Sequence, residues 1–271
     1  MPVPREPGTT PAVLELERVS HAFVKRTGRV DVLRDISLSV RSEEFVTVVG
    51  PSGCGKSTIL NLAVGLLRPS SGEIRFHGKP VTRIVDRIGY VTQKQTLLPW
   101  RTLRRNVEFI LEIRGVSQAS RARRAAELIE QVGLCGFENH YPHELSGGMR
   151  QRAVVIRSLA NDPEALLLDE PYGALDAQTR GALQNQLMSL HADTRKTMVF
   201  VTHDLVEAVA LADRVIVLSR SPATVRAEHV VAIPRPRDVF AIHNEPEFRR
   251  VYDVVKDQVL GYDSKAEADV A

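Results

Sequence analysis

The sequence has few cysteines, few aromatic residues and no long apolar run. It contains two cysteines, one tryptophan and 5% aromatic residues among 271. Two cysteines cannot form the dense disulfide framework of a small secreted domain, which favours a reducing compartment. No run approaches the about 18 apolar residues that a membrane-spanning helix needs, and residues 1–10 lack the apolar core of a signal peptide. The composition therefore excludes a membrane pore and predicts a disordered segment over residues 1–11.

A strong charge of one sign is also missing. The 36 lysines and arginines nearly balance 33 acidic residues, which gives a formal net charge of +3. The densest basic stretch, from Arg101 to Arg124, contains few aromatic residues and matches no nucleic-acid-binding module. Solvated surfaces explain most of these arginines. We therefore expect no nucleic-acid partner.

A glycine-rich loop at 50–57 stands between an apolar run and a helical segment. It fits the P-loop pattern in the strand–loop–helix context that the pattern requires. Backbone N–H groups of such a loop turn toward phosphate oxygens, and the positive end of the following helix adds to them. We expect Lys56 to neutralise the outer phosphates of ATP and Ser57 to offer its hydroxyl to Mg²⁺. The residues predicted to bind the nucleotide here are Gly50, Pro51, Ser52, Gly53, Cys54, Gly55, Lys56, Ser57 and Thr58.

Two adjacent carboxylates follow a second apolar run. Residues 165–168 predict a buried parallel strand, and Asp169 and Glu170 stand at its carboxyl end, where open α/β sheets bind ligands. We expect Asp169 to hold Mg²⁺, and Glu170 to orient or deprotonate a water that attacks the γ-phosphate. Taken alone, such a pair is usually a strand end that meets solvent. Its pairing with the P-loop favours the catalytic interpretation.

A second glycine-rich segment, Leu-Ser-Gly-Gly-Met-Arg-Gln at 145–151, precedes another helical pattern. Ser146 can cap that helix while Gly147 and Gly148 leave amides exposed, so an anion can bind there. With this segment the chain resembles the ATP-binding cassette (ABC) ATPases of membrane transporters, whose signature loop has the same residues. The resemblance implies that Ser146, Gly147 and Gly148 cap the γ-phosphate held by the P-loop of a second copy. It therefore implies a head-to-tail homodimer that encloses two ATP molecules.

Other motifs of the family follow in the expected order. The resemblance implies that Gln93 contacts Mg²⁺ and the γ-phosphate, that Asp176 belongs to the D-loop over 173–176, and that His203 is the switch histidine. Phe23 stands where the family has an aromatic residue that stacks on adenine. Without the P-loop, each of these would be an ordinary loop, strand-end or core residue.

The periodicity predicts an α/β fold of the P-loop NTPase type. Alternating residues over 12–40 predict an N-terminal antiparallel β portion, and Gly78 marks the turn of another hairpin. Short apolar strands separated by helical segments predict a mixed sheet core with parallel pairing. The strands are expected at 45–49, 166–168, 198–201 and 215–218, and the helices between them at 179–190 and 205–212.

A helical insert is expected over about 101–160. Thr102 can cap a helix over 103–113, and Ser120 can precede a helix over 121–132 that Gly133 closes. The resemblance makes this insert the helical subdomain of an ATPase domain over 12–240. An amphipathic helix and then a polar tail from Asp263 are expected over 241–271.

Short segments narrow the resemblance. Leu-Leu-Pro-Trp at 97–100, Glu-Pro-Tyr-Gly at 170–173 and Ile-Pro-Arg-Pro-Arg-Asp at 233–238 resemble importers of nitrate, sulfonates and taurine. The family then implies a peripheral ATPase at the cytoplasmic face of the inner membrane, with permease subunits as partners and an extracytoplasmic solute-binding protein as an indirect one. Trp100 is either a half-buried turn residue or the rim of a groove for a permease helix. An exporter subunit, another importer class, a non-transport ABC ATPase and a small-molecule kinase stay open as alternatives.

Overall fold

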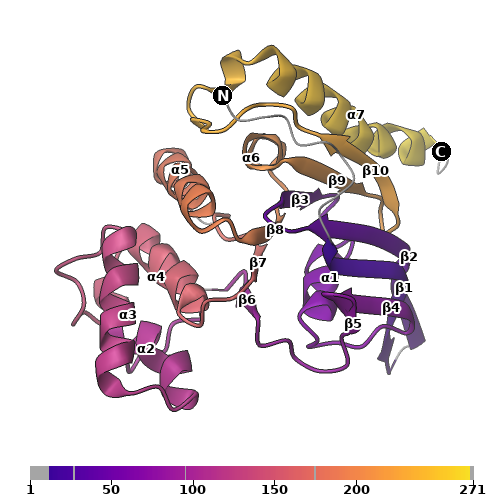
Figure 1. Ribbon diagram of the computed structural model, residues 1–271. Coiled ribbons are helices and arrows are strands. Elements are labelled where there is room, and N and C mark those ends of the chain that lie inside the picture. Colours follow the sequence, from indigo (N-terminus) through magenta and orange to yellow (C-terminus); the bar gives the residue numbers. More distant parts are fainter. Residues whose placement is uncertain (1–11, 27, 95, 174, 269–271) are drawn as a thin grey trace.

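The computed structural model describes residues 12–268 except 27, 95 and 174, so the segment 1–11 lies outside the described residues (Figure 1). A six-stranded sheet with the order β10-β9-β3-β8-β7-β6 runs through the middle of the molecule. Its strands are β3 (Phe45–Val49), β6 (Ile88–Val91), β7 (Ala165–Asp169), β8 (Thr197–Val201), β9 (Arg214–Leu218) and β10 (Val225–Val230). All neighbours pair in parallel except β9 and β10, which are antiparallel.

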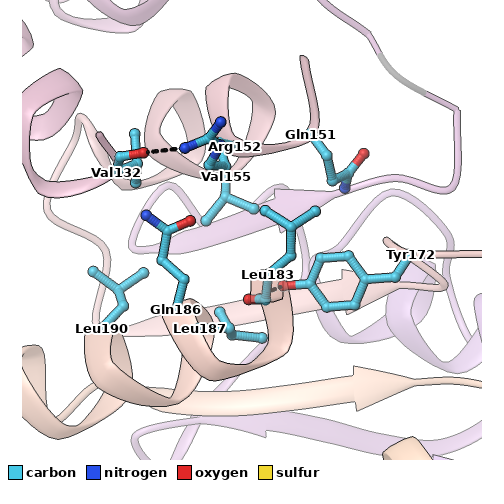
Figure 2. Close-up of a pocket in the computed structure, with 9 residues that line it drawn as sticks. All are labelled: Val132, Gln151, Arg152, Val155, Tyr172, Leu183, Gln186, Leu187 and Leu190. Carbon is cyan, nitrogen blue, oxygen red and sulfur yellow. Dashed lines mark hydrogen bonds between the residues drawn. The ribbon is translucent and has the colours of Figure 1, made fainter. Parts of the chain in front are cut away.

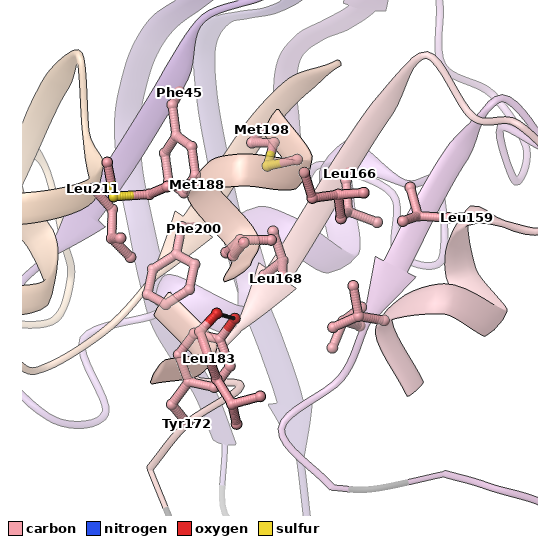
Figure 3. Packing of buried hydrophobic residues seen from close by; sticks show 14 of the residues in the cluster. Phe45, Leu159, Leu166, Leu168, Tyr172, Leu183, Met188, Met198, Phe200 and Leu211 are labelled. Carbon is pink, nitrogen blue, oxygen red and sulfur yellow. Dashed lines mark hydrogen bonds between the residues drawn. The ribbon is translucent and has the colours of Figure 1, made fainter. Parts of the chain in front are cut away.

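The middle strands of this sheet are buried on both faces. Every residue of β3, β7 and β8 is buried, which agrees with their nearly continuous apolar sequences. One face, with Phe45, Leu168 and Phe200, packs against helices later in the chain, including Leu183 of α5 (Figure 3). The other face packs against α1 (Lys56–Ala63) and a second sheet.

The second sheet is antiparallel and has the order β2-β1-β4-β5. Its strands are β1 (Ala12–Lys25), β2 (Gly28–Arg41), β4 (Ser71–Phe76) and β5 (Lys79–Pro80). The turn between β4 and β5 has positive φ at His77 (49°) and Gly78 (71°), as a tight hairpin turn requires. The predicted mixed core with an N-terminal antiparallel portion is therefore confirmed.

The helical insert forms a separate lobe (Figure 1, magenta). It contains α2 (Leu103–Ile113), α3 (Gln118–Gln131), the 3-10 turn η1 (Pro142–Glu144) and α4 (Gly147–Leu159). Thr102 caps α2 as predicted, and Gly133 follows α3 with a φ of 63°. The cap of α3 is a correction, because Ser117 rather than Ser120 begins it. The Ser117 backbone is extended and its hydroxyl accepts the N–H of Ser120, so Ser120 lies inside the helix.

The remaining helices pack on the face of the sheet that carries Phe45, Leu168 and Phe200. They are α5 (Ala177–Thr194), α6 (Leu205–Leu211), the 3-10 turn η2 (Ile242–Asn244) and α7 (Pro246–Ala268). The backbone of α7 stays helical through Ala268 and so includes the first residues of the polar segment from Asp263. Strand β10 was not predicted, because its residues alternate between half-buried and exposed on a sheet edge. Within the part of the chain that is described, no helix is long and apolar enough to cross a membrane.

Candidate functional site

The P-loop connects β3 to α1 at the carboxyl end of the parallel strands. Gly55 precedes α1 with a φ of 115°, and a Cβ there would lie 2.7 Å from Leu33 and 2.8 Å from Val32. A glycine is therefore needed both for the backbone angle and for the close approach of β2. Lys56 is buried, and its Nζ donates to the carbonyls of Gly50 (2.8 Å) and Pro51 (3.0 Å), which folds the loop around the ammonium group.

A hydroxyl and a carboxylate meet at the start of α1. Ser57 Oγ donates to Asp169 Oδ1 at 3.0 Å, so the loop is tied to the end of β7. Asp169 is only 5% exposed, and burial, reinforced by the charge of Glu170, raises its pKa. Tyr90 of β6, which the sequence analysis did not single out, lies beside Asp169. Burial and that carboxylate raise the pKa of Tyr90 well above its usual value, so its hydroxyl stays protonated beside Asp169.

These donors fit a magnesium ion that is bound together with a nucleotide. Mg²⁺ usually takes one or two protein oxygens and completes its octahedron with waters and phosphate oxygens. Ser57 and Asp169 supply a hydroxyl and a carboxylate within reach of the phosphate loop. No group of three or more His, Cys, Asp or Glu side chains suited to a metal occurs among the described residues. The hydroxyl and the carboxylate suit a metal that is bound together with phosphates.

Glu170 lies where two other predicted residues converge. Its Oε2 accepts a hydrogen bond from Gln93 Nε2 at 3.2 Å, and His203 Nδ1 lies 3.1 Å from the same oxygen. The backbone of Glu170 has a φ of 44°, which costs a non-glycine residue about 1–2 kcal/mol. Its N–H donates to Val201 of β8 at 2.9 Å, which holds this conformation. Such strain is concentrated at functional sites.

Phe23 lines an open cavity of about 490 Å³ together with Gln93, Glu170 and His203. The residue is 37% exposed, and its ring meets that of His21 edge to face, with centroids 4.7 Å apart and an interplanar angle of 85°. The exposed part of Phe23 lines the cavity, where it can contact another flat group. The cavity is lined by Phe23, Val32, Ser52, Gly53, Gly55, Lys56, Ser57, Thr58, Gln93, Glu170 and His203. The lining does not include the other predicted residues, of which Gly50, Cys54 and Asp169 are buried and Pro51 is half-buried. Cys54 is not in a disulfide.

The second glycine-rich segment does not line this cavity. Ser146 begins α4 as predicted, and its Oγ accepts the N–H of Met149 at 3.2 Å. Asp176 begins α5 in the same way, through the N–H of Thr179 at 2.9 Å. A separate hollow borders Ser146, Gly148 and Thr179, and a Cβ on Gly147 would lie 3.4 Å from Leu175. The signature segment and the D-loop thus lie together, apart from the P-loop of their own chain, and Ala174 lies outside the described residues.

An apolar hollow lies between α4 of the helical lobe and α5 of the core (Figure 2). Arg152 Nη1 donates to the carbonyl of Val132 at 2.8 Å on one side, and the Tyr172 hydroxyl donates to the carbonyl of Leu183 at 3.4 Å on the other.

Trp100 stands elsewhere on the helical lobe, in a turn, and is 71% exposed. The alternative that Trp100 is a half-buried turn residue is therefore wrong.

The fold, the P-loop and the two glycine-rich segments can be compared with known proteins. A family model described as ABC transporter matches residues 33–173, from β2 to the segment after Glu170. The chain belongs to the ABC transporter family. This membership removes the small-molecule kinase from the open alternatives.

Similar proteins of this family span nearly the whole chain. This ABC protein is 44% identical to an ABC transporter ATP-binding protein of Methanocaldococcus jannaschii, over 91% of this chain and 92% of the relative. It is 40% identical to a nitrate import ATP-binding protein of Synechocystis sp., over 95% and 99% of the two chains. A taurine import ATP-binding protein of Yersinia pestis is 48% identical over 71% of this chain and 76% of its own.

Solved structures agree with the family. A dimeric ATP-binding cassette in a post-hydrolysis state, bound to ADP and phosphate, superposes with a TM-score of 0.73 and 33% sequence identity. The match covers 82% of this ABC protein and 100% of the other chain. The chain therefore has the ABC ATPase cassette fold.

Proposed function

We propose that this ABC protein binds and hydrolyses ATP to power a membrane importer of nitrate, taurine, an aliphatic sulfonate or a similar small solute. The observation that supports it most directly is the convergence of Gln93 and His203 on Glu170, beside the P-loop. The similarity to nitrate and taurine import proteins supports the direction and the class of solute. The exporter and non-transport alternatives have no comparable support.

In this proposal the side chains of the cavity divide the work. Phe23 stacks on the base, the P-loop amides and Lys56 hold the phosphates, and Ser57 and Asp169 hold Mg²⁺. The ion neutralises charge on the transferred phosphoryl group. Glu170 orients the attacking water and accepts its proton, because its carboxylate faces the cavity and is held by its neighbours. Gln93 and His203 sense the γ-phosphate from either side of Glu170.

The other half of the site comes from a second copy in this proposal. Ser146, Gly147, Gly148 and Asp176 lie together but away from the P-loop cavity of their own chain. A head-to-tail dimer lets them cap the γ-phosphate on the partner. The dimeric ATP-binding cassette of similar fold supports this arrangement.

The permease is the proposed membrane partner, at the cytoplasmic face of the inner membrane, with a solute-binding protein as an indirect partner. Trp100 offers an exposed aromatic residue on the helical lobe, the kind of side chain that anchors interfaces. We assign residues 12–240 to the ATPase domain, about 101–160 of it to the helical subdomain that meets the permease, and 241–271 to a C-terminal extension.

Replacing Glu170 by glutamine tests the proposed hydrolysis. Glu170→Gln keeps the side chain's size but removes its basicity, so we expect ATP turnover to fall by about 100-fold or more while ATP binding persists. Gel filtration with MgATP should then show a dimer. Glu164→Gln is the matched control, because Glu164 stands at the opposite end of β7 in exposed ion pairs with His77 and Arg87. Turnover by Glu170→Gln within twofold of the control would contradict the assigned role.

A further inference from the structure

His203 is not fixed by packing. Its side chain is 56% exposed, and its Nδ1 lies 3.1 Å from Glu170 Oε2. It stands in the short loop between β8 and α6, so the position of the ring depends on the backbone around it. The residues on both sides of His203 therefore decide whether it meets Glu170.

The hydroxyl of Thr202 hydrogen-bonds to residues on the other side of His203 in the sequence. Its Oγ accepts the N–H of Asp204 at 3.0 Å and donates to Glu207 Oε2 at 2.5 Å, so the hydroxyl serves as acceptor and donor at once. Thr202 is 2% exposed. A buried hydroxyl that donates one hydrogen bond and accepts another fixes the backbone around it in a way that an apolar side chain cannot.

Glu207 connects the loop to α5. Its second oxygen, Oε1, accepts Gln184 Nε2 at 2.7 Å, and both side chains are nearly buried (6% and 4% exposed). Burial raises the pKa of Glu207. A buried carboxyl group carries a desolvation penalty that its hydrogen bonds only partly offset, so these hydrogen bonds are weak evidence that Glu207 stabilises the fold. The two hydrogen bonds of Glu207 hold Thr202 at a fixed distance from α5.

Arg180 supports the other side of His203 from the same helix. It donates to Asp204 Oδ2 at 3.2 Å and to the carbonyl of Leu175 at 2.9 Å. Asp204 Oδ1 in turn accepts the N–H groups of Val206 (2.9 Å) and Glu207 (3.2 Å) and so begins α6. Helix α5 therefore holds the residues before and after His203, and it starts at the D-loop.

We propose that Thr202, Glu207 and Gln184 are positioning residues that hold His203 against Glu170. We name these three residues the switch clamp. Through Arg180, α5 also ties this placement to the D-loop backbone, so a second copy that moves the D-loop changes the geometry at Glu170. The inference rests on the proposed function, and it adds a reason why hydrolysis depends on residues that do not touch the cavity.

The hydroxyl of Thr202 can be removed without changing its shape. Thr202→Val has nearly the same volume but loses both hydrogen bonds, whereas Thr202→Ser keeps the hydroxyl. In the full-length chain we expect Thr202→Val to lower kcat for ATP by about tenfold to 100-fold, because a displacement of about 1 Å at a catalytic group has effects of that size. KM for ATP should stay within about twofold, since the phosphate contacts remain. Thr202→Ser should keep most of the activity.

A second pair of variants covers the case in which Thr202→Val does not fold. Gln184→Met removes the hydrogen bond to Glu207 at similar length, and Gln186→Met on the same helix is its control, because Gln186 faces the apolar hollow between α4 and α5 (Figure 2). We expect a lower kcat at constant KM for Gln184→Met only. A kcat for Thr202→Val or a folded Gln184→Met within twofold of its control would overturn the clamp.

Crystal structures of the variants separate this inference from the proposed function. If the wild-type chain binds or hydrolyses no ATP, the proposed function fails, but the position of His203 can still be measured. A Nδ1 to Oε2 distance near 3.1 Å in wild type and Thr202→Ser, and a displaced ring in Thr202→Val, support the clamp. An unmoved ring in Thr202→Val refutes it.

Discussion

Phe23→Ala should weaken ATP binding while leaving the phosphate site intact. Phe23 lines the same cavity as the P-loop residues, and its ring meets His21 edge to face. Truncation to alanine removes the flat surface on which we expect the base to stack.

The expected loss follows from the exposure of the ring. Stacking of a base on an aromatic side chain contributes about 1–3 kcal/mol by alanine substitution. The residue Phe23 is only 37% exposed, so only the part of its ring that is open to the cavity gains from stacking. We therefore take the lower half of that range, about 1–2 kcal/mol, which corresponds to a five- to 30-fold higher Kd. Phe23→Tyr and Phe23→Trp should keep most of the affinity.

Calorimetric titration of MgATP into the Glu170→Gln background measures this Kd without turnover. Phe137→Ala is the matched control, because Phe137 has the same exposed fraction of 37% but lies in the helical lobe. GTP should lose as much affinity as ATP, because stacking tolerates either base. If Phe23→Ala bound ATP as tightly as Phe137→Ala, the assignment of Phe23 to the base would be wrong.

Two further predictions concern stability. Asp169→Asn should raise the free energy of unfolding of the metal-free chain near pH 7. Burial raises the pKa of Asp169 in the folded state. The wild-type carboxyl group therefore contributes stability below pH 3.8, its usual pKa, and this contribution is lost as the pH rises through the folded pKa. Urea unfolding at several pH values should show this gain shrinking toward acid, and a gain that grows toward acid would refute the sign. The variant should also lose stabilisation by MgATP, about 2.7 kcal/mol for wild type at 100 times Kd. Gly55→Ala should cost more stability than Gly53→Ala: both glycines have positive φ (115° and 73°), but only at Gly55 would a Cβ collide with Leu33 and Val32. We expect about 1–2 kcal/mol for Gly53→Ala and about 1–3 kcal/mol more for Gly55→Ala, from thermal unfolding, and equal costs would contradict the collision.

Local features of the chain were read correctly from sequence. Ser146 and Thr102 begin their helices, because a hydroxyl that accepts an N–H three residues later is a local contact. Ser117 and Ser120 are both able to cap, so the choice between them needed the backbone angles and was predicted wrongly. Strand β10 was missed for the opposite reason, since an edge strand with one solvated face has no strong apolar pattern.

The sequence by itself determined the fold class, the P-loop and the order of the motifs, because each is written in a few adjacent residues whose spacing fixes a turn, a cap or a buried strand. Only the tertiary structure decided which side chains meet. Parallel pairing of β6, β7 and β8 brings Gln93, Glu170 and the segment after β8 to one edge, although they lie far apart in the chain. The same packing places Tyr90 beside Asp169 and brings Gln184 within hydrogen-bond distance of Glu207. Such contacts depend on how distant segments share a core, and no local pattern specifies them.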